Sequence, residues 1–459
     1  MYAPPIHAVP RQQDDKLRLV VHHSCGQFSL NSMINREDIA GVRLDGLRSF
    51  GASLLAFRKV HPSTPLIMWK ADVTAAYQQM PMHPSWKIFQ IISAFNKRRV
   101  DRCNNFGGRA SQKIWASFIS LVLWIAVFRR NLRTLKCYVD DNYSFAKQGD
   151  ITFYPPYKKY MPTDQVKLLL LWDEINLPRD EAKQVSGPIL TCIGFDIDPN
   201  TMTVVMSPDR RQALIETCEQ FLKVGARHSL HDFQSLQGHI NWSLNVYPQL
   251  QPALCASYTK TAGKSEPNGL IRVNNDMRQE LIWFIDHVRN SDGVHFLKSA
   301  EWSPADSHLS ATVAYVDASG VGIGIWFPAE YIGYQCSLPL EAPKDMIFFF
   351  EALAVCSAIH LSRNFTKTSR LIIYTDNSNT FDIFNSLRAL PPYNCILISA
   401  MNILMDNDLD LQVVLISGKN NIIADPLSRF CNSLAVQLAP RLTIFDFIPP
   451  RDPLGESKK

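Results

Sequence analysis

The 459-residue sequence has no Cys-x-x-Cys pair among its ten cysteines, no internal repeat and no low-complexity tract. Scattered cysteines argue against a zinc ribbon, and no secretory leader is recognisable, which argues against a disulfide framework. We therefore expect reduced, buried cysteines in an intracellular protein, cytoplasmic or nuclear. The longest uncharged apolar run, residues 114–128, is too short to span a bilayer comfortably. It predicts a buried helix and no membrane partner.

The composition is that of a folded protein with more than one core. Hydrophobic residues make up 46% of the chain and charged residues 19%, which excludes general disorder. A chain of this length exceeds a single core, so we expect two or three domains. The net charge of +5 suits a polyanionic partner without identifying one. Basic residues crowd the first third, at 97–99, 129–136 and 158–159, although an ordinary solvated surface would look the same.

Residue patterns in the first part of the chain predict short strands with a few helices. Residues 1–15 suggest an extended lead-in, and residues 16–160 suggest strands interrupted by one long helix after Ser111. Further predicted elements are a helix at 164–176, two strands within 189–206, helices over 207–258 and a helix at 275–288. Ser229 with Asp232 suggests a helix-start box.

The last third changes character and predicts a mixed sheet with helices packed on it. The expected strands lie at 312–317, 321–327, 331–338, 370–376 and 411–417, the second of them punctuated by glycine; the expected helices lie at 347–361, twice within 377–406 and at 422–430. Residues after 433 show no pattern that we can interpret.

Three acids in the first part mark a candidate metal site. Asp72 ends an apolar strand at 66–69, and Asp140 and Asp141 lie between the predicted strands 134–139 and 143–146. Adjacent like charges are costly unless a cation neutralises them. Two divalent ions, about 3.5–4 Å apart and held by Asp72 and Asp140 with Asp141 beside them, would support phosphoryl transfer. A lone Asp-Asp pair is more often an ordinary hairpin turn.

Four acids in the last third form a second candidate metal site. Asp317 and Asp376 end predicted strands, Glu351 lies in an apolar helix, and Asp425 opens the final helix. Asp425 precedes a proline and has the alternative role of a helix N-cap. An unpaired, buried Glu351 would be expensive. Convergence of all four around two Mg²⁺ ions would explain them together and would suit phosphodiester hydrolysis.

The residues around both acid groups resemble a known family. Tyr-Val-Asp-Asp at 138–141, preceded by Asp-x-x-x-Ala-Tyr at 72–77, resembles the catalytic hairpin and metal-binding segment of reverse transcriptases. The order Asp, Glu, Asp, Asp, with Ala-Asp-Pro-Leu-Ser-Arg at 424–429, resembles RNase H in its retrotransposon form over roughly 309–432. His-His-Ser at 22–24, where many relatives have Asp, an aromatic residue and Arg, is most similar to DIRS-type elements of the tyrosine-recombinase class.

The resemblance implies roles for other residues. Lys16 and Arg18 would lie on the fingers strand and hold the incoming triphosphate. Their i and i+2 spacing puts them on one face of a strand. The alternative, a pair of solvated strand residues that contact template phosphate or nothing, would have the same spacing. Phe106 and Gly107 would pack under the templating base and the nucleotide, and Lys183 would protonate pyrophosphate.

Tyr77, by its position relative to Asp72, would lie under the sugar of the incoming nucleotide. Its ring would then clash with a 2′-hydroxyl, the group that distinguishes RNA from DNA; an ordinary core tyrosine is the alternative. The segment 192–195 is similar to the hairpin that grips the primer end, and 236–242 to the first thumb helix.

The implied fold class is α+β multidomain, a right-hand polymerase followed by a connection segment and an RNase H-like mixed α/β domain. The expected boundaries are 1–206 for fingers and palm, 207–261 for the thumb, 262–305 for the connection, 306–432 for the RNase H-like domain and 433–459 for a tail. Relatives usually have more fingers residues before the fingers strand, so we expect this part to be short.

The implied activity is that of a retrotransposon RNA-directed DNA polymerase, a nucleotidyltransferase, that also cleaves the RNA strand of RNA–DNA hybrids as an endonuclease. The cofactor would be Mg²⁺, with Mn²⁺ as an alternative. The partners would be an RNA or DNA template with its primer, RNA–DNA hybrid and dNTPs. Two rivals remain: a catalytically weak or silent nucleic-acid-binding derivative, and a DNA-templated polymerase with an unrelated nuclease.

Overall fold

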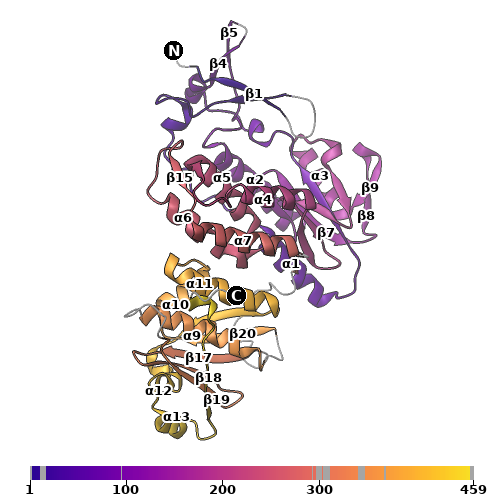
Figure 1. Cartoon of the computed structure of the whole chain (residues 1–459). Helices are drawn as coiled ribbons and strands as arrows, with labels where there is room; N and C mark the ends of the chain where they lie inside the picture. The colour runs from indigo at the N-terminus through magenta and orange to yellow at the C-terminus, as the bar shows by residue number, and fades with distance from the viewer. Residues whose placement is uncertain are drawn as a thin grey trace. The chain divides into compact units, whose positions relative to one another are not determined.

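The structure is a computed structural model that describes residues 3–10, 17–94, 96–291, 293–295, 302, 311–339, 347–365 and 369–454; at 10, 18, 19, 294 and 295 it describes the backbone alone. The chain mixes helices and strands throughout (Figure 1). It divides into two compact units, Met1–Val205 and Met206–Lys459. Lys16, which precedes the described range 17–94, lies outside the described residues.

The first unit is built on a four-stranded antiparallel sheet. Its strand order is β10 (Val185–Gly187), β3 (Leu66–Asp72), β7 (Asp141–Lys147) and β6 (Lys136–Tyr138). The register of β3 and β7 places Asp72 opposite Asp141. Helices α2 (Ser111–Arg129) and α3 (Thr163–Glu174) share an apolar core with β3, and its largest side chains are Trp69, Trp115 and Trp172.

Helix α2 is buried on one side only, so the prediction of a buried helix is wrong for its other side. Trp115, Ile119 and Val122 lie in the core, whereas Trp124 is 51% exposed and Phe128 70% exposed. Among the described residues this is the one helix whose length and apolar composition would suit a membrane span, a test that core helices of soluble proteins also pass. A helix that is apolar all round carries no sequence signal for which side packs.

Two predictions about short strands need correction or extension. The lead-in contains a strand, β1 (Ile6–Pro10), which pairs with β2 (Leu17–Val21). Residues 189–206 form three strands rather than two, because Ile193 and Gly194 both take positive φ in a two-residue turn. The remaining elements of this unit are α1 (Leu47–Val60), β4 (Ile91–Ala94), β5 (Lys97–Val100), β8 (Ile151–Tyr154), β9 (Lys159–Pro162), β11 (Leu190–Cys192), β12 (Phe195–Asp198) and β13 (Thr203–Met206).

The second unit begins with helices, as the sequence predicts. They are α4 (Pro208–Glu219), α5 (Leu230–Ser243), α6 (Cys255–Thr261) and α7 (Asn275–Asn290), with a short ribbon of β14 (Arg227–Ser229) and β15 (Leu270–Arg272). The predicted helix-start box is confirmed, because the Asp232 amide donates to Ser229 Oγ over 3.1 Å and the Ser229 amide donates to the Asp232 carboxylate over 2.9 Å.

A six-stranded mixed sheet forms the rest of the second unit. Its order is β21 (Asp410–Leu415), β20 (Arg370–Thr375), β17 (Thr312–Ala318), β18 (Gly322–Phe327), β19 (Ile332–Ser337) and β22 (Thr443–Asp446). The first five confirm the predicted strands to within about two residues. The sixth lies in the stretch without a pattern and pairs in parallel with β19. Pairing to an existing edge, rather than its own residue pattern, makes it a strand.

Helices cover both faces of this sheet (Figure 1). One face packs against α9 (Ile347–Ser362) and α11 (Pro391–Asp406) in the main core. A smaller core includes residues of α12 (Ala424–Ser428) and α13 (Asn432–Leu438). Helix α10 (Ser378–Ser386) completes the predicted set of helices.

Glycines on β18 let α12 approach the sheet at backbone distance. A Cβ added to Gly324 would lie 2.4 Å from both the Ala424 carbonyl oxygen and the Ser428 amide nitrogen. A Cβ on Gly322 would lie 3.0 Å from the Ser428 carbonyl oxygen. The glycine punctuation of this strand is therefore a packing requirement.

Gly324→Ala is expected to destabilise the second unit, because backbone atoms of α12 must move to admit the methyl group. Overpacking of this kind costs about 1–3 kcal/mol or more. Gly320→Ala, where a Cβ would meet nothing within 4 Å, is the matched control and should change the free energy of unfolding little. Urea unfolding of the two variants measures the difference, and equal stabilities would contradict the close packing of α12.

Candidate active sites

The first acid group lies where three chain segments end together. Asp72 is the last residue of β3, Asp141 is the first residue of β7, and Asp140 lies in the two-residue turn between β6 and β7. The other turn residue, Val139, has a φ of 62°, which is strained for a β-branched side chain. Trp115 fixes this turn by donating from Nε1 to the Val139 carbonyl over 2.6 Å. Strain held in place by packing is typical of functional sites.

Two lysines balance the facing carboxylates. Lys183 Nζ lies 2.8 Å from Asp72 Oδ1, and Lys70 Nζ lies 3.0 Å from Asp141 Oδ1. The buried Gln184 side chain accepts from the Asp72 amide over 3.3 Å and donates to the Asp72 carbonyl over 3.0 Å. The backbone of Asp72 is therefore fixed independently of its carboxylate.

Burial makes this site unfavourable for negative charge. It raises the pKa of Asp72, and the Lys183 hydrogen bond offsets only part of the effect. Burial also raises the pKa of Asp140, with further contributions from the charges of Asp72 and Asp141. Deprotonated carboxylates in such a place are stabilised by a nearby cation. Asp72 and Asp140 are the residues that would hold a divalent ion here, with Asp141 engaged by Lys70.

Tyr77 lies beside the first acid group. It belongs to the short helix η2 (Ala76–Gln79), and its ring centroid is 5.1 Å from that of Phe106. Burial raises the pKa of its hydroxyl, and the charge of Asp140 adds to the shift. The structure thus brings together three residues that the sequence assigns to one site, Tyr77, Phe106 and Asp140.

Gly107 connects this site to the N-terminal strands. Its φ is 92°, and an added Cβ would lie 3.6 Å from the Val21 carbonyl oxygen at the end of β2. Asn31 donates from Nδ2 to the Gly107 carbonyl over 2.8 Å. The backbone of Arg18 lies in β2, but its side chain, like Lys16, is outside the described residues. The triphosphate-holding role of these two cations stays a prediction.

The second acid group is more tightly gathered than the first. Asp317 in β17, Glu351 in α9 and Asp376 just after β20 each place one carboxylate oxygen within 4.8 Å of the others. Across the described part of the chain, this is the one group of three potential ligand residues so close together. Asp317 is 5% exposed and Glu351 6% exposed, and Glu351 Oε2 is buried without a hydrogen-bond partner.

The electrostatics of this group favour either protons or a metal ion. Burial, together with the charges of Asp317 and Asp376, raises the pKa of Glu351 to about 9. Burial also raises the pKa of Asp317 to about 6, and it raises that of Asp376. Carboxylate oxygens are the ligands that Mg²⁺ and Mn²⁺ prefer. The unpartnered Glu351 oxygen among two other acids fits such an ion.

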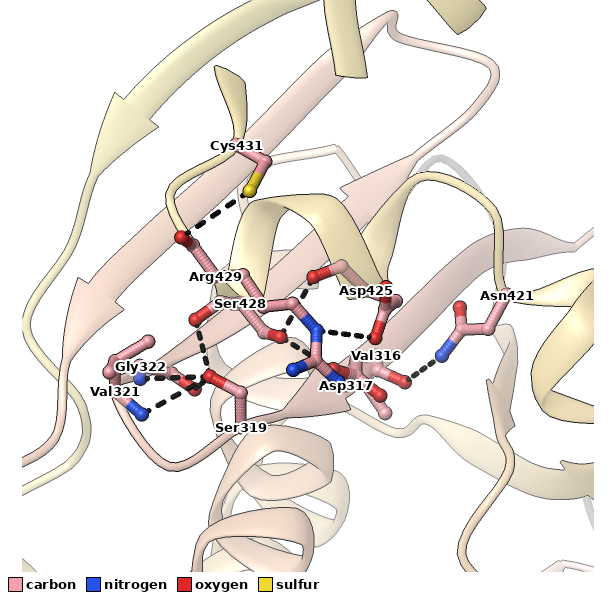
Figure 2. A network of polar contacts seen from close by, with 10 residues as sticks. All are labelled: Val316, Asp317, Ser319, Val321, Gly322, Asn421, Asp425, Ser428, Arg429 and Cys431. Carbon is pink, nitrogen blue, oxygen red and sulfur yellow. Dashed lines mark hydrogen bonds and ion pairs between the residues drawn. The ribbon is translucent and has the colours of Figure 1, made fainter. Parts of the chain in front are cut away.

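Asp425 lies beside this group without joining it. Its Oδ1 accepts from Arg429 Nε over 2.9 Å, as Figure 2 shows. Its charge still reaches the cluster, because it contributes to the raised pKa values of Asp317 and Asp376. A metal-binding role for Asp425 stays a prediction.

Four residues of these sites were missed in the sequence. Lys70 precedes Asp72 by two positions, and the cross-strand register that brings its side chain to Asp141 depends on tertiary pairing. Gln184 and Trp115 act through backbone groups far away in sequence, which no motif reveals. Ser428 lies inside the recognised Ala-Asp-Pro-Leu-Ser-Arg segment, yet only the structure shows its hydroxyl 2.5 Å from Asp317 Oδ2.

No family model and no curated protein matches the chain. Solved structures of foamy viral protease-reverse transcriptase are similar at low levels. The form in complex with RNA/DNA hybrid is 13% identical with a TM-score of 0.45, and the match covers 90% of this chain and 50% of that one. The forms with double-stranded DNA have 14% and 12% identity, TM-scores of 0.42 and 0.44, and matches covering 90% and 97% of this chain and 65% and 78% of theirs.

This chain thus spans about half the length of the first of these structures. Scores this low do not define a common fold, so function has to be inferred from the chain's own residues and geometry.

Stability in the presence of a metal chelator is expected to fall as pH rises, because Glu351 prefers to be neutral when folded. Its folded pKa of about 9 exceeds the ordinary value of 4.5, so its contribution is complete below about pH 4.5 and is lost towards pH 9. Asp317 and Glu280, with pKa values of about 6 and about 7, finish titrating earlier. Glu351 still contributes to the slope above about pH 7.5, together with buried cysteines whose pKa values are raised to about 12. The difference between the unsubstituted chain and a Glu351 variant isolates its share.

Glu351→Gln should therefore flatten the dependence of the unfolding free energy on pH by up to about 1.4 kcal/mol per pH unit between about pH 7.5 and 8.5. Urea titrations at several pH values measure this slope. Exposed Glu216→Gln is the matched control and should leave the slope unchanged. Added Mg²⁺ should stabilise the unsubstituted chain at the upper end of this range and should not stabilise Glu351→Gln to the same extent.

Proposed function

We propose that the chain is an RNA-directed DNA polymerase of a DIRS-type retrotransposon that also cleaves the RNA strand of RNA–DNA hybrids. The observation that carries the proposal is the pair of separate carboxylate groups, Asp72 with Asp140 and Asp317 with Glu351 and Asp376. Each group gathers buried and half-buried acids at strand ends and, for Glu351, in helix α9, inside sequence segments that resemble the two catalytic centres of that family. The proposed location is intracellular, cytoplasmic or nuclear.

In the proposed polymerase, Asp72 and Asp140 would hold Mg²⁺. When bound, the metal supplies activation of the primer 3′-hydroxyl and neutralisation of the leaving pyrophosphate. Lys183 carries the proton that pyrophosphate requires, and its bond to Asp72 raises the pKa of its ammonium group, so it stays protonated at neutral pH. Lys70 keeps Asp141 beside the other two acids. Tyr77, resting on Phe106, excludes nucleotides that carry a 2′-hydroxyl.

In the proposed nuclease, Asp317, Glu351 and Asp376 would hold Mg²⁺, and Asp425, which pairs with Arg429, is the fourth candidate ligand. The metal supplies an activated water and stabilises the developing charge on the scissile phosphate. The protein provides the fixed positions of the three acids, from β17, α9 and the end of β20. The substrate is the RNA strand of the hybrid that the polymerase makes.

The two activities are expected to separate by substitution, because each carboxylate group holds its own ions. Asp140→Asn should abolish primer extension on poly(rA)/oligo(dT), reducing it by at least about a thousandfold, and should leave hybrid cleavage intact. Asp376→Asn should do the reverse. Both assays are run with Mg²⁺ and with Mn²⁺ on the same preparations.

Unchanged circular dichroism in both variants serves as the folding control for these assays. Loss of both activities from either substitution, in a folded protein, would show that the acids have been assigned to the wrong sites. An unsubstituted chain that binds hybrid and catalyses neither reaction would instead support a silent nucleic-acid-binding protein.

Tyr77→Val is expected to weaken discrimination against ribonucleotides. Removal of the ring opens the space in which we place the 2′-hydroxyl, so the ratio of kcat/KM for dNTP over rNTP should fall by about tenfold or more. Tyr77→Phe, which keeps the ring and its contact with Phe106, is the matched control and should retain the ratio. An unchanged ratio in an active Tyr77→Val variant would contradict the role of the ring.

A further inference from the structure

The hydroxyl of Ser428 lies against the acid cluster of the second unit. Ser428 is fully buried in α12, and its Oγ lies 2.5 Å from Asp317 Oδ2 and 2.9 Å from the Asp425 carbonyl oxygen. A hydroxyl has one proton and can donate to only one of these acceptors at a time. An ionised carboxylate is the stronger acceptor, and 2.5 Å is typical of a charge-assisted O–H···O⁻ bond. The proton therefore belongs to the bond with Asp317 whenever that carboxyl is ionised.

The position of Ser428 is itself fixed by the sheet, as Figure 2 shows. Its carbonyl accepts from Ser319 Oγ over 2.7 Å, and Ser319 Oγ in turn accepts from the amides of Val321 and Gly322 over 3.2 Å. Gly324 leaves no room between α12 and β18, as described above. The Ser428 hydroxyl thus has little freedom to move away from Asp317.

We infer that Ser428 is a positioning residue of the second acid cluster, holding one Asp317 oxygen so that the carboxylate is already oriented as a metal ligand beside Glu351 and Asp376. This inference rests on the nuclease activity proposed above. A carboxylate without such a partner must lose rotational freedom when a metal binds. Partners of metal ligands typically contribute about tenfold to a hundredfold in metal affinity or activity.

The test uses the full chain carrying Asp140→Asn, so that metal binding reports on the second cluster. Adding Ser428→Ala should weaken Mn²⁺ binding, measured by calorimetry, by about tenfold. In the chain without Asp140→Asn, it should lower kcat for hybrid cleavage by about tenfold to a hundredfold while the KM for hybrid stays the same. Ser428→Thr keeps the hydroxyl and should retain most of the Mn²⁺ affinity and most of the kcat for hybrid cleavage. Ser428→Cys is closer to serine in size but is a weaker donor. Its Mn²⁺ affinity and its kcat for hybrid cleavage should lie between those of Ser428→Ala and those of the unsubstituted chain.

Ser243→Ala is the matched control, because Ser243 is also fully buried in the second unit and donates to the carbonyl three residues before it, whereas no hydrogen bond among the described residues joins its hydroxyl to the acid cluster. It should lower the unfolding free energy about as much as Ser428→Ala and retain Mn²⁺ affinity.

Equal loss of Mn²⁺ affinity in Ser243→Ala and Ser428→Ala would reduce Ser428 to a structural residue and overturn the inference. Normal Mn²⁺ affinity and cleavage in Ser428→Ala, or in Ser428→Cys should the alanine variant not fold, would overturn it as well. A chain with an intact second cluster that binds no Mn²⁺ would overturn the proposed nuclease activity and, with it, this inference. Mn²⁺ binding that Ser428→Ala leaves unchanged would overturn the inference alone, so the two failures can be told apart.

Discussion

Repulsion between buried carboxylates is the constraint around which both units are built. Asp72 faces Asp141 across a strand pair, and Asp317, Glu351 and Asp376 share a space of a few ångströms. Burial, and then the charges of neighbouring acids, raise the pKa values of Asp72, Asp140 and Glu351, so the folded chain favours either a proton or a cation at these places. The surrounding structure has to overcome this repulsion to keep the acids together.

The two units overcome it by different means. In the first, Lys70 and Lys183 supply positive charge directly, and Trp115 holds the strained turn that carries Asp140. In the second, the main means is packing: glycines on β18 bring α12 against the sheet, and Ser428 reaches Asp317 from there. The first cluster is thus partly neutralised by its own side chains, whereas the second depends more on an added cation or on protonation.

Much of the fold follows from local patterns. The alternating and apolar segments predict the five strands 312–338, 370–376 and 411–417 and the helices between them, because a core-facing strand or helix repeats its apolar residues with a fixed period. The same reasoning fails for α2, which is apolar on all sides and packs on only one. It fails for β22 too, whose strand conformation comes from pairing with β19 rather than from its own residues.

The sequence alone singled out the acids on which the proposal rests, because Asp72, Asp140, Asp317, Glu351 and Asp376 stand at strand ends or in an apolar helix where a lone charge would be costly. Tertiary structure decided which of them meet and what balances them. The pairing of Lys70 with Asp141 and the bond from Ser428 to Asp317 join residues through strand register and helix docking. Those contacts span residues whose separation along the chain carries no periodic signal, so only the folded structure reveals them.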